Sequence, residues 1–359
     1  MAWGEMMYIG EKETKWLLTI LMTSQIFVSG INIFTKAAGT SAAFVAFLSF
    51  VLVFAYLFFV DKIKVSQNVG IFSMMNECYG KFTVVIGAVL SALSALNCSM
   101  RLKMFTSSVT DIILPDSPQN FVLIFFVISM IAVSFFGLET VTRYALPVGT
   151  VVVIFASLVC VFNLEGYKIT NIYPLLGNGS EGIALSAGSL RIFADIFYLF
   201  VFADYFRNDG ALKRVGLKSL ALSGIIITLV TLFYTLAVPY PASQSFDYPF
   251  FRLSSLANTS VLFQRLDAAV YVIWLFSGFL SCGAMALLSM IIFSKTFGLS
   301  DYKGIIHGFV FIIATFSLVE KNYFNLINSI FATFVFSLIA VTALIYRFKI
   351  ISGRNKSEG

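Results

Sequence analysis

The stretch Ile183–Phe206, IALSAGSLRIFADIFYLFVFADYF, is apolar over the length of a membrane span and carries charges near its middle. These charges are Arg191, Asp195 and Asp204. A charge in the hydrocarbon core costs roughly 2.5 to 3.5 kcal/mol even on the lenient insertion scale, so such groups pair, face a water-filled cavity or serve a function. We therefore expect the functional centre to lie in this segment.

Composition places the chain in the membrane. Of its 359 residues 59% are hydrophobic and 12% are charged, whereas soluble domains carry about 25% charged residues. The net charge of +6 comes from Lys and Arg in short connections between apolar runs, where they set orientation. A lipid bilayer is therefore the expected environment, and nucleic acid is not an expected partner.

Nine further apolar runs reach or approach the length of about 20 residues that a membrane helix needs, and Ile305–Val319 is a short one. They are Trp16–Thr35, Ala42–Val60, Phe82–Met100, Phe121–Leu138, Ala145–Leu164, Leu220–Val238, Ala268–Phe293, Ile305–Val319 and Leu326–Tyr346. Together with the charged sixth segment they predict an all-α polytopic membrane protein of ten helices. We expect a single transmembrane domain over residues 1–359, with long connections at 101–119, 165–182 and 239–265.

Lys and Arg are distributed unequally between alternate connections. With the N-terminus inside, 16 of the 24 fall on the inner side and 7 on the outer side, and Arg191 lies within the membrane. Cytoplasmic loops carry the excess of positive charge, so we expect both termini in the cytoplasm.

Two helices contain residues that weaken a helix in the middle of an apolar run. Glycine costs about 1 kcal/mol there, and Ser and Asn compete for backbone hydrogen bonds. The two stretches consist of Ser29, Gly30, Ile31 and Asn32 in the first segment, and Ser186, Ala187, Gly188 and Ser189 in the sixth.

The two stretches lie five spans apart. Transporters with two inverted five-helix repeats place broken helices at such corresponding positions, and substrate binds at the breaks. We therefore expect a LeuT-like fold with repeats at about 16–164 and 183–346, broken helices 1 and 6, and a ligand near the breaks, where free amides attract an anion. The alternative is that Gly30 and Gly188 are helix-packing contacts.

Further polar residues extend the candidate site. Arg191 and Asp195 are spaced i, i+4 and share a helix face, so they either form a structural ion pair or contact a charged ligand. Asn97 belongs to a polar stripe with Ser91, Ser94 and Cys98, and Trp274 and Ser277 belong to a second stripe. Such stripes line a polar cavity or mediate helix packing.

Several kinds of chemistry are not expected. His307 is the only histidine, and the four cysteines form no C-x-x-C pair, as expected of small buried hydrophobic residues. The sequence holds no P-loop, Rossmann glycine pattern or HExxH motif. We expect neither an enzyme nor a bound metal or cofactor.

Motifs in the second half resemble the endospore germination permease family, the B subunits of spore germinant receptors. They are Tyr248-Pro249, Arg252, Gln264-Arg265-Leu266-Asp267 and Trp274, and the opening Thr14-Lys15-Trp16 through Gln25 to Gly30 also fits. Where family members tend to show a Phe-x-Gly-x-Glu-like run in the sixth helix, this chain has Phe193-Ala194-Asp195-Ile196, without the glycine.

The resemblance implies similarity to the amino acid–polyamine–organocation transporters and their LeuT-type fold. It implies a location in the spore inner membrane beside an A subunit and a lipoprotein C subunit, and sensing of a small germinant, often an amino acid. Arg265 and Asp267, at the outer mouth of the eighth helix, are expected to fix the 239–265 loop or to be a solvated helix end. The alternatives are an active amino-acid permease and a structural subunit that no longer binds ligand.

Overall fold

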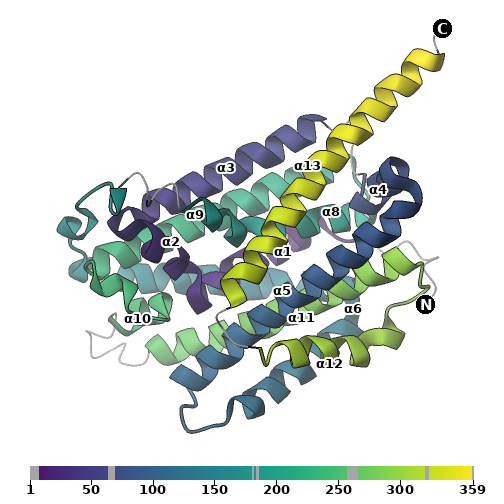
Figure 1. The fold of residues 1–359 in the computed structure, drawn as a ribbon. Helices are drawn as coiled ribbons and strands as arrows, with labels where there is room; N and C mark the ends of the chain where they lie inside the picture. The colour runs from purple at the N-terminus through teal and green to yellow at the C-terminus, as the bar shows by residue number, and fades with distance from the viewer. Residues whose placement is uncertain are drawn as a thin grey trace.

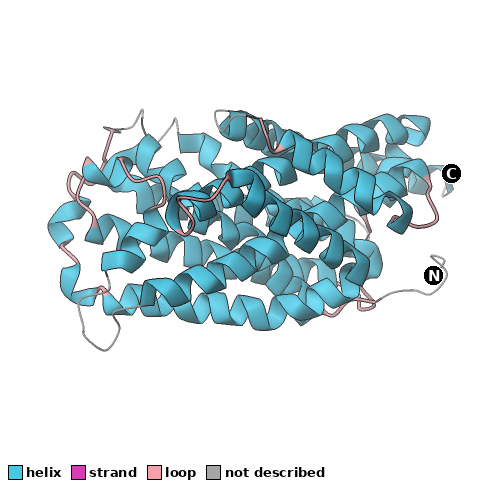
Figure 2. Ribbon diagram, turned by 90° about the horizontal axis from the view of Figure 1, so that it is seen from below, coloured by secondary structure: helices cyan, strands magenta, loops and turns pink. Residues whose placement is uncertain are grey.

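The computed structural model describes residues 8–63, 69–179, 182, 186–256, 266–319 and 323–357. All regular structure in these residues is helical (Figures 1 and 2). The α-helices are α1 Glu11–Gln25, α2 Ile31–Ala38, α3 Ala42–Ile63, α4 Ile71–Tyr79, α5 Thr83–Ile112, α6 Gln119–Phe162, α8 Tyr198–Phe202, α9 Ala211–Ala237, α10 Pro249–Leu256, α11 Leu266–Phe297, α12 Ile306–Phe316 and α13 Phe324–Ser357.

Six helical stretches within the described residues are long and apolar enough to cross a membrane. They are Ile31–Ile63, Ile71–Ile112, Gln119–Phe162, Ala211–Ala237, Ala268–Phe297 and Asn325–Ser352. The expectation of an all-helical integral membrane protein is thereby confirmed, while the count of ten spans stays a prediction.

The first predicted span is a composite helix. A π-helical turn, Ile26–Gly30 (η1), joins α1 to α2. A Cβ atom on Gly30 would lie 2.8 Å from the carbonyl oxygen of Gln25 and 3.1 Å from Ile192 Cδ1. Glycine therefore allows the wide turn and the close approach of the sixth segment. The predicted break is thus a change of helix type, of the kind often found at functional sites.

The sixth predicted span is irregular over a longer distance. Residues Ser186–Phe197 form a 3₁₀ helix (η6), followed by α8 and a second 3₁₀ turn, Ala203–Tyr205. Runs of 3₁₀ helix beyond three or four residues are uncommon, and mid-helix stretches often mark a hinge or strain. The irregularity extends well beyond the predicted stretch Ser186–Ser189.

The third span is longer than predicted. We expected it to end at Met100 and a connection to occupy residues 101–119, but α5 runs on to Ile112. No Gly or Pro interrupts the chain between Arg101 and Ile112, and the first Pro is Pro115. Arg101 therefore lies within the bundle rather than in an outer loop.

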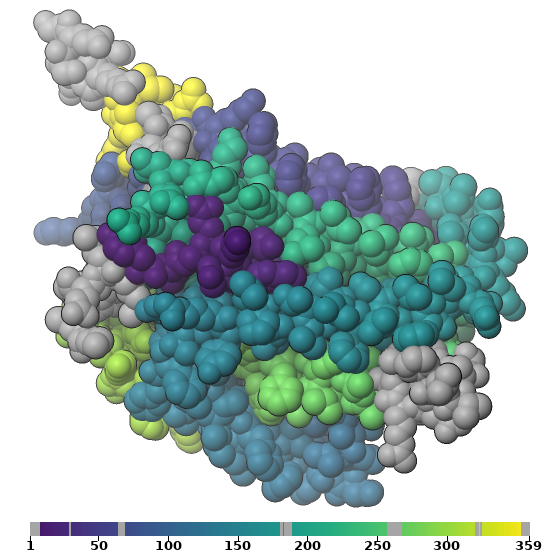
Figure 3. All heavy atoms as spheres, turned by 180° about the vertical axis from the view of Figure 1, so that it is seen from behind, coloured from purple at the N-terminus to yellow at the C-terminus, as the bar shows by residue number. Residues whose placement is uncertain are grey.

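The fourth and fifth predicted spans form the continuous stretch α6, which bends at Gly137. This residue has φ 79° and ψ 171°, outside the helical range, and divides the stretch into two helices. The positive φ is accessible to glycine at little cost. On the face drawn in Figure 3, α6 lies between the start of the chain and α11, and it contacts both α1 and α11.

The connections predicted at 165–182 and 239–265 contain short helices where they are described. The first contains the 3₁₀ turn Ile169–Ile172, and the second contains α10. The start of α1 and the end of α13 lie at one end of the bundle, and α10 lies at the other (Figures 1 and 2). The first end is called inner below and the second outer, following the predicted orientation.

Candidate ligand-binding site

The centre of the bundle contains an ion pair between α5 and η6. Arg101 Nη2 lies 2.6 Å from Asp195 Oδ2, and the side chains are 4% and 1% exposed. Removing one partner of a buried pair leaves an uncompensated charge, at a cost of about 3 to 5 kcal/mol. The pair therefore holds α5 against η6.

Hydrogen bonds attach the same centre to α1. Arg101 Nη1 donates to the carbonyl oxygen of Leu21 at 2.6 Å and approaches Ser24 Oγ at 3.5 Å. Gln25 Nε2 lies 3.2 Å from the Ile192 carbonyl oxygen and 3.2 Å from Asp195 Oδ2, and donates to both. The ion pair thus joins three helices at the point where α1 passes into η1.

Several polar atoms in this interior have no hydrogen-bond partner in the described part of the chain. An unsatisfied buried group costs about 1 to 3 kcal/mol, so a cluster of them marks a place where water or a polar ligand belongs. Three of the atoms belong to residues that meet at the ion pair, and they are Gln25 Oε1 on α1, Asn97 Nδ2 on α5 and Asp195 Oδ1 on η6. Two more, Trp274 Nε1 and Ser277 Oγ, lie on α11.

A line of hydroxyl groups continues from this centre toward the inner end. Tyr198 lies near Asp195. Its hydroxyl oxygen is 2.8 Å from Ser94 Oγ, and Ser94 Oγ is 2.6 Å from Ser289 Oγ. All three residues are buried. The line joins η6, α5 and α11 by side-chain contacts.

Three of the predicted site residues outside η6 lie on α5 and α11. Asn97 lies beside the Asp195 carboxyl, but its Nδ2 atom lacks the geometry of a hydrogen bond. Trp274 and Ser277 lie on α11, and the Trp274 ring centroid is 6.1 Å from that of Phe105 on α5. Trp274 also lines a small pocket with rings from η1 and α10, Phe27, Phe250 and Phe251 among them.

The residues around the two breaks make separate contacts. Asn32 Nδ2 donates to the Asp247 carbonyl oxygen in the outer loop at 2.8 Å, and Ser189 Oγ lies 2.6 Å from Ser49 Oγ on α3. Ile31 is fully buried. For Ser29 and Gly188 only the backbone is described, in η1 and η6.

The predicted pairing of Arg191 with Asp195 is wrong. Arg191 Nη2 donates to Asn325 Oδ1 at 2.9 Å, and Nη1 donates to Ser329 Oγ at 3.0 Å, both on α13. Asp195 instead pairs with Arg101. On the 3₁₀ helix, with three residues per turn, positions i and i+4 no longer share a face.

Of the two residues expected to fix the 239–265 loop, Arg265 lies outside the described residues, and Asp267 is described only as backbone within α11. Tyr248, which belongs to the same set of motifs, donates a hydrogen bond to the Asp111 carboxylate at the end of α5. Burial and the contact with Asp111 raise the pKa of Tyr248, so the phenol keeps its proton and this outer contact.

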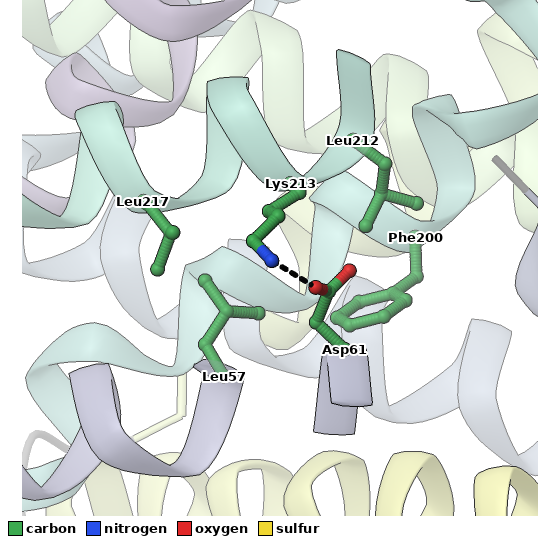
Figure 4. A pocket seen from close by; sticks show the side chains of 6 residues that line it. All are labelled: Leu57, Asp61, Phe200, Leu212, Lys213 and Leu217. Carbon is green, nitrogen blue, oxygen red and sulfur yellow. Dashed lines mark ion pairs between the residues drawn. The ribbon is translucent and has the colours of Figure 1, made fainter. Parts of the chain in front are cut away.

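At the inner end three ion pairs connect the helices. Lys295 Nζ lies 2.7 Å from Asp204 Oδ2, and Arg214 Nη2 lies 2.7 Å from Glu11 Oε1. Figure 4 shows the third, in which Lys213 and Asp61 point toward each other over a pocket lined by Leu57, Phe200, Leu212 and Leu217. The Arg214 hydrogen bond lowers the pKa of Glu11, so this connection persists at neutral pH.

Arg101 and Gln25 are the residues of this polar centre that the sequence-based list of site residues did not contain. Arg101 was counted among the outer-loop charges. The uninterrupted helical sequence up to Pro115 was the available signal, since it predicts that Arg101 lies inside a helix. Gln25 stood only among the residues of the family resemblance.

A family model described as "Spore germination protein" matches residues 13–326. The chain belongs to this family. A search of curated proteins finds no match to this chain. Among solved structures it is similar to Mhp1, a nucleobase-cation-symport-1 family transporter in a closed conformation with bromovinylhydantoin bound. The TM-score is 0.64 at 12% identity, with 90% of this chain and 75% of the Mhp1 chain covered. The chain therefore has a transporter-like fold.

Proposed function

We propose that this chain is the germinant-sensing membrane subunit of a spore germination receptor. It binds a small germinant, in our proposal an amino acid, between helix 1 (α1, η1 and α2) and helix 6 (η6 and α8), and signals to an A subunit and a lipoprotein C subunit. In this proposal the protein lies in the spore inner membrane, with both termini in the cytoplasm. The observation that carries the proposal is the group of unsatisfied polar atoms around Arg101–Asp195, next to two irregular helices.

The fold proposal is ten spans in two inverted repeats. It divides α6 at Gly137 into spans 4 and 5, and counts the η6–α8 stretch as span 6 and α12 as span 9. The similarity to Mhp1 over 90% of the chain supports this arrangement. In such folds substrate lies where the discontinuous helices face each other, which is the position of the polar centre.

Germination of spores that lack the endogenous copy and carry variants of this chain tests the proposal. Gln25→Ala and Asn97→Ala remove unsatisfied groups of the centre without removing the ion pair, so they should raise the germinant concentration needed for half-maximal response. Thr315→Ala on α12 is the matched control, because this exposed hydroxyl contacts only its own helix. If both Gln25→Ala and Asn97→Ala respond to the same germinant concentration as the unmodified chain, at normal protein level, the result contradicts a ligand site at this centre. It favours a structural subunit that does not bind ligand.

An amino-acid permease is the second candidate, favoured by the fold shared with Mhp1. Uptake into liposomes that contain only this chain separates the two functions. A sensing subunit should give little concentrative amino-acid uptake on its own, with or without an ion gradient. Strong ion-coupled uptake by the lone chain would replace the receptor proposal with the permease.

A further inference from the structure

We propose that the ligand is a zwitterion whose two charges replace the Arg101–Asp195 contact. In this exchange, which rests on the proposed function, an anionic group of the ligand accepts hydrogen bonds from Arg101, and a cationic group donates to Asp195. The internal contact between Arg101 Nη2 and Asp195 Oδ2 breaks, and two contacts to the ligand form. Arg101 thereby becomes a ligand-binding residue.

The exchange is possible because the two charged residues belong to different helices. Arg101 belongs to α5 and Asp195 to η6, so a movement of one helix relative to the other can separate them. The guanidinium stays in place when Asp195 leaves, because Leu21 and Ser24 on α1 also contact it. The pair can therefore open to admit a ligand while Arg101 remains oriented.

The unsatisfied atoms match both ends of such a ligand. Asp195 Oδ1 and Gln25 Oε1 are acceptors, as an ammonium group with three donors requires. Asn97 Nδ2 is a donor that lies beside the Asp195 carboxyl, so it can donate to a ligand carboxylate that takes the place of Asp195 next to Arg101. Donors and acceptors at the centre thus correspond to the two halves of a zwitterion.

Charge balance favours a zwitterion over the other classes of ligand. The pair has zero net charge, and burial of an unpaired charge is strongly unfavourable. An anion would leave Asp195 without a partner, and a cation would leave Arg101 without one. An uncharged molecule would replace the contact between two charges by weaker hydrogen bonds that involve only one charge each.

Ligand-induced thermal stabilisation of the purified full-length chain provides the test. The twenty standard amino acids are tested singly, with D-glucose and glycerol as uncharged compounds. For the amino acid with the largest shift, the carboxamide, which is cationic, and the 2-hydroxy acid, which is anionic, are then titrated. Each analogue lacks one charge and should bind roughly 30-fold or more weakly, because a charged group then stays buried without its partner.

A variant comparison assigns the carboxylate to Arg101. In Arg101→Gln the preference for the amino acid over its carboxamide should fall toward one. Arg143→Gln is the matched control, since Arg143 forms an ion pair of the same 2.6 Å length with Glu139 on the exposed surface, and should keep the full preference.

Equal binding of either analogue by the unmodified chain overturns the inference, whatever the variants do. A shift by glucose or glycerol and by no amino acid also overturns it, while the binding function stands. A chain stabilised by none of these compounds contradicts both the inference and the proposed function.

Discussion

Removal of one charge from the Arg101–Asp195 pair should destabilise the protein strongly. Arg101→Gln leaves a carboxylate that is 1% exposed, and Asp195→Asn leaves a guanidinium that is 4% exposed. A stranded buried charge costs about 3 to 5 kcal/mol. With an unfolding entropy of about 2.1 cal/mol/K per residue, the 359-residue chain should lose roughly 4 to 7 °C in Tm.

The Tm of the double variant shows whether the two charges stabilise the protein as a pair. Arg101→Gln with Asp195→Asn removes both charges, and two neutral amides can still form hydrogen bonds, so at least half of the lost Tm should return. Thermal unfolding of the purified variants in one detergent measures all three. Arg143→Gln and Glu139→Gln serve as controls, because an exposed pair contributes about 0.3 to 0.5 kcal/mol, which corresponds to less than about 1 °C.

Single variants that lose no more Tm than the surface controls would show that the two charges do not depend on each other. A double variant as unstable as the sum of the two single variants would refute the pairing in the same way. Either result removes the physical basis for placing the functional centre between α5 and η6.

Three further predictions concern orientation, helix geometry and pH. In a background without the four natural cysteines, Ser245→Cys should react with an impermeant thiol reagent from outside and Ser300→Cys only after permeabilisation; the reverse pattern contradicts termini in the cytoplasm. Gly30→Ala places a Cβ atom 2.8 Å from the Gln25 carbonyl oxygen and should lower both Tm and germinant response, whereas Gly308→Ala, with no neighbour within 4 Å, should leave them unchanged or raise Tm slightly. Because the folded-state pKa of Glu11 is lowered, its stabilising contribution is present above the ordinary pKa near 4.3 and is lost as pH falls through the folded value. The Tm difference between wild type and Glu11→Gln should therefore be measurable at pH 7 and vanish in acid. A Tm difference that grows in acid would contradict this expectation.

Apolar length and the weak helix formers carried most of the fold prediction. The run Ala42–Val60 lies within α3, and the run Leu220–Val238 coincides with α9 except for its last residue, because a helix satisfies its own backbone groups in lipid. Gly30 and Ser186–Ser189 indicated the two irregular helices, because glycine and serine weaken a helix locally. The type of irregularity, a π turn in one helix and a long 3₁₀ helix in the other, depends on packing between segments and cannot be predicted from helix propensity.

The partners within the site were predicted less well. Asp195 stood out because a charge in an apolar run is costly, but its partner lies 94 positions earlier in the chain. The i, i+4 rule that paired it with Arg191 assumes an α-helix, and the segment is 3₁₀. Arg101 was missed because a charged residue at the end of an apolar run resembles the start of a loop. It lies inside the bundle because the helix continues beyond the apolar run to Ile112.

A cryo-electron microscopy structure of the chain with its stabilising amino acid would show the ligand site itself. We expect ligand density between η1 and η6, within hydrogen-bonding distance of Arg101 and Asp195, with these two side chains no longer in contact. Density at another position, such as the inner pocket between Asp61 and Lys213, with Arg101 still bonded to Asp195, would contradict the proposed ligand site.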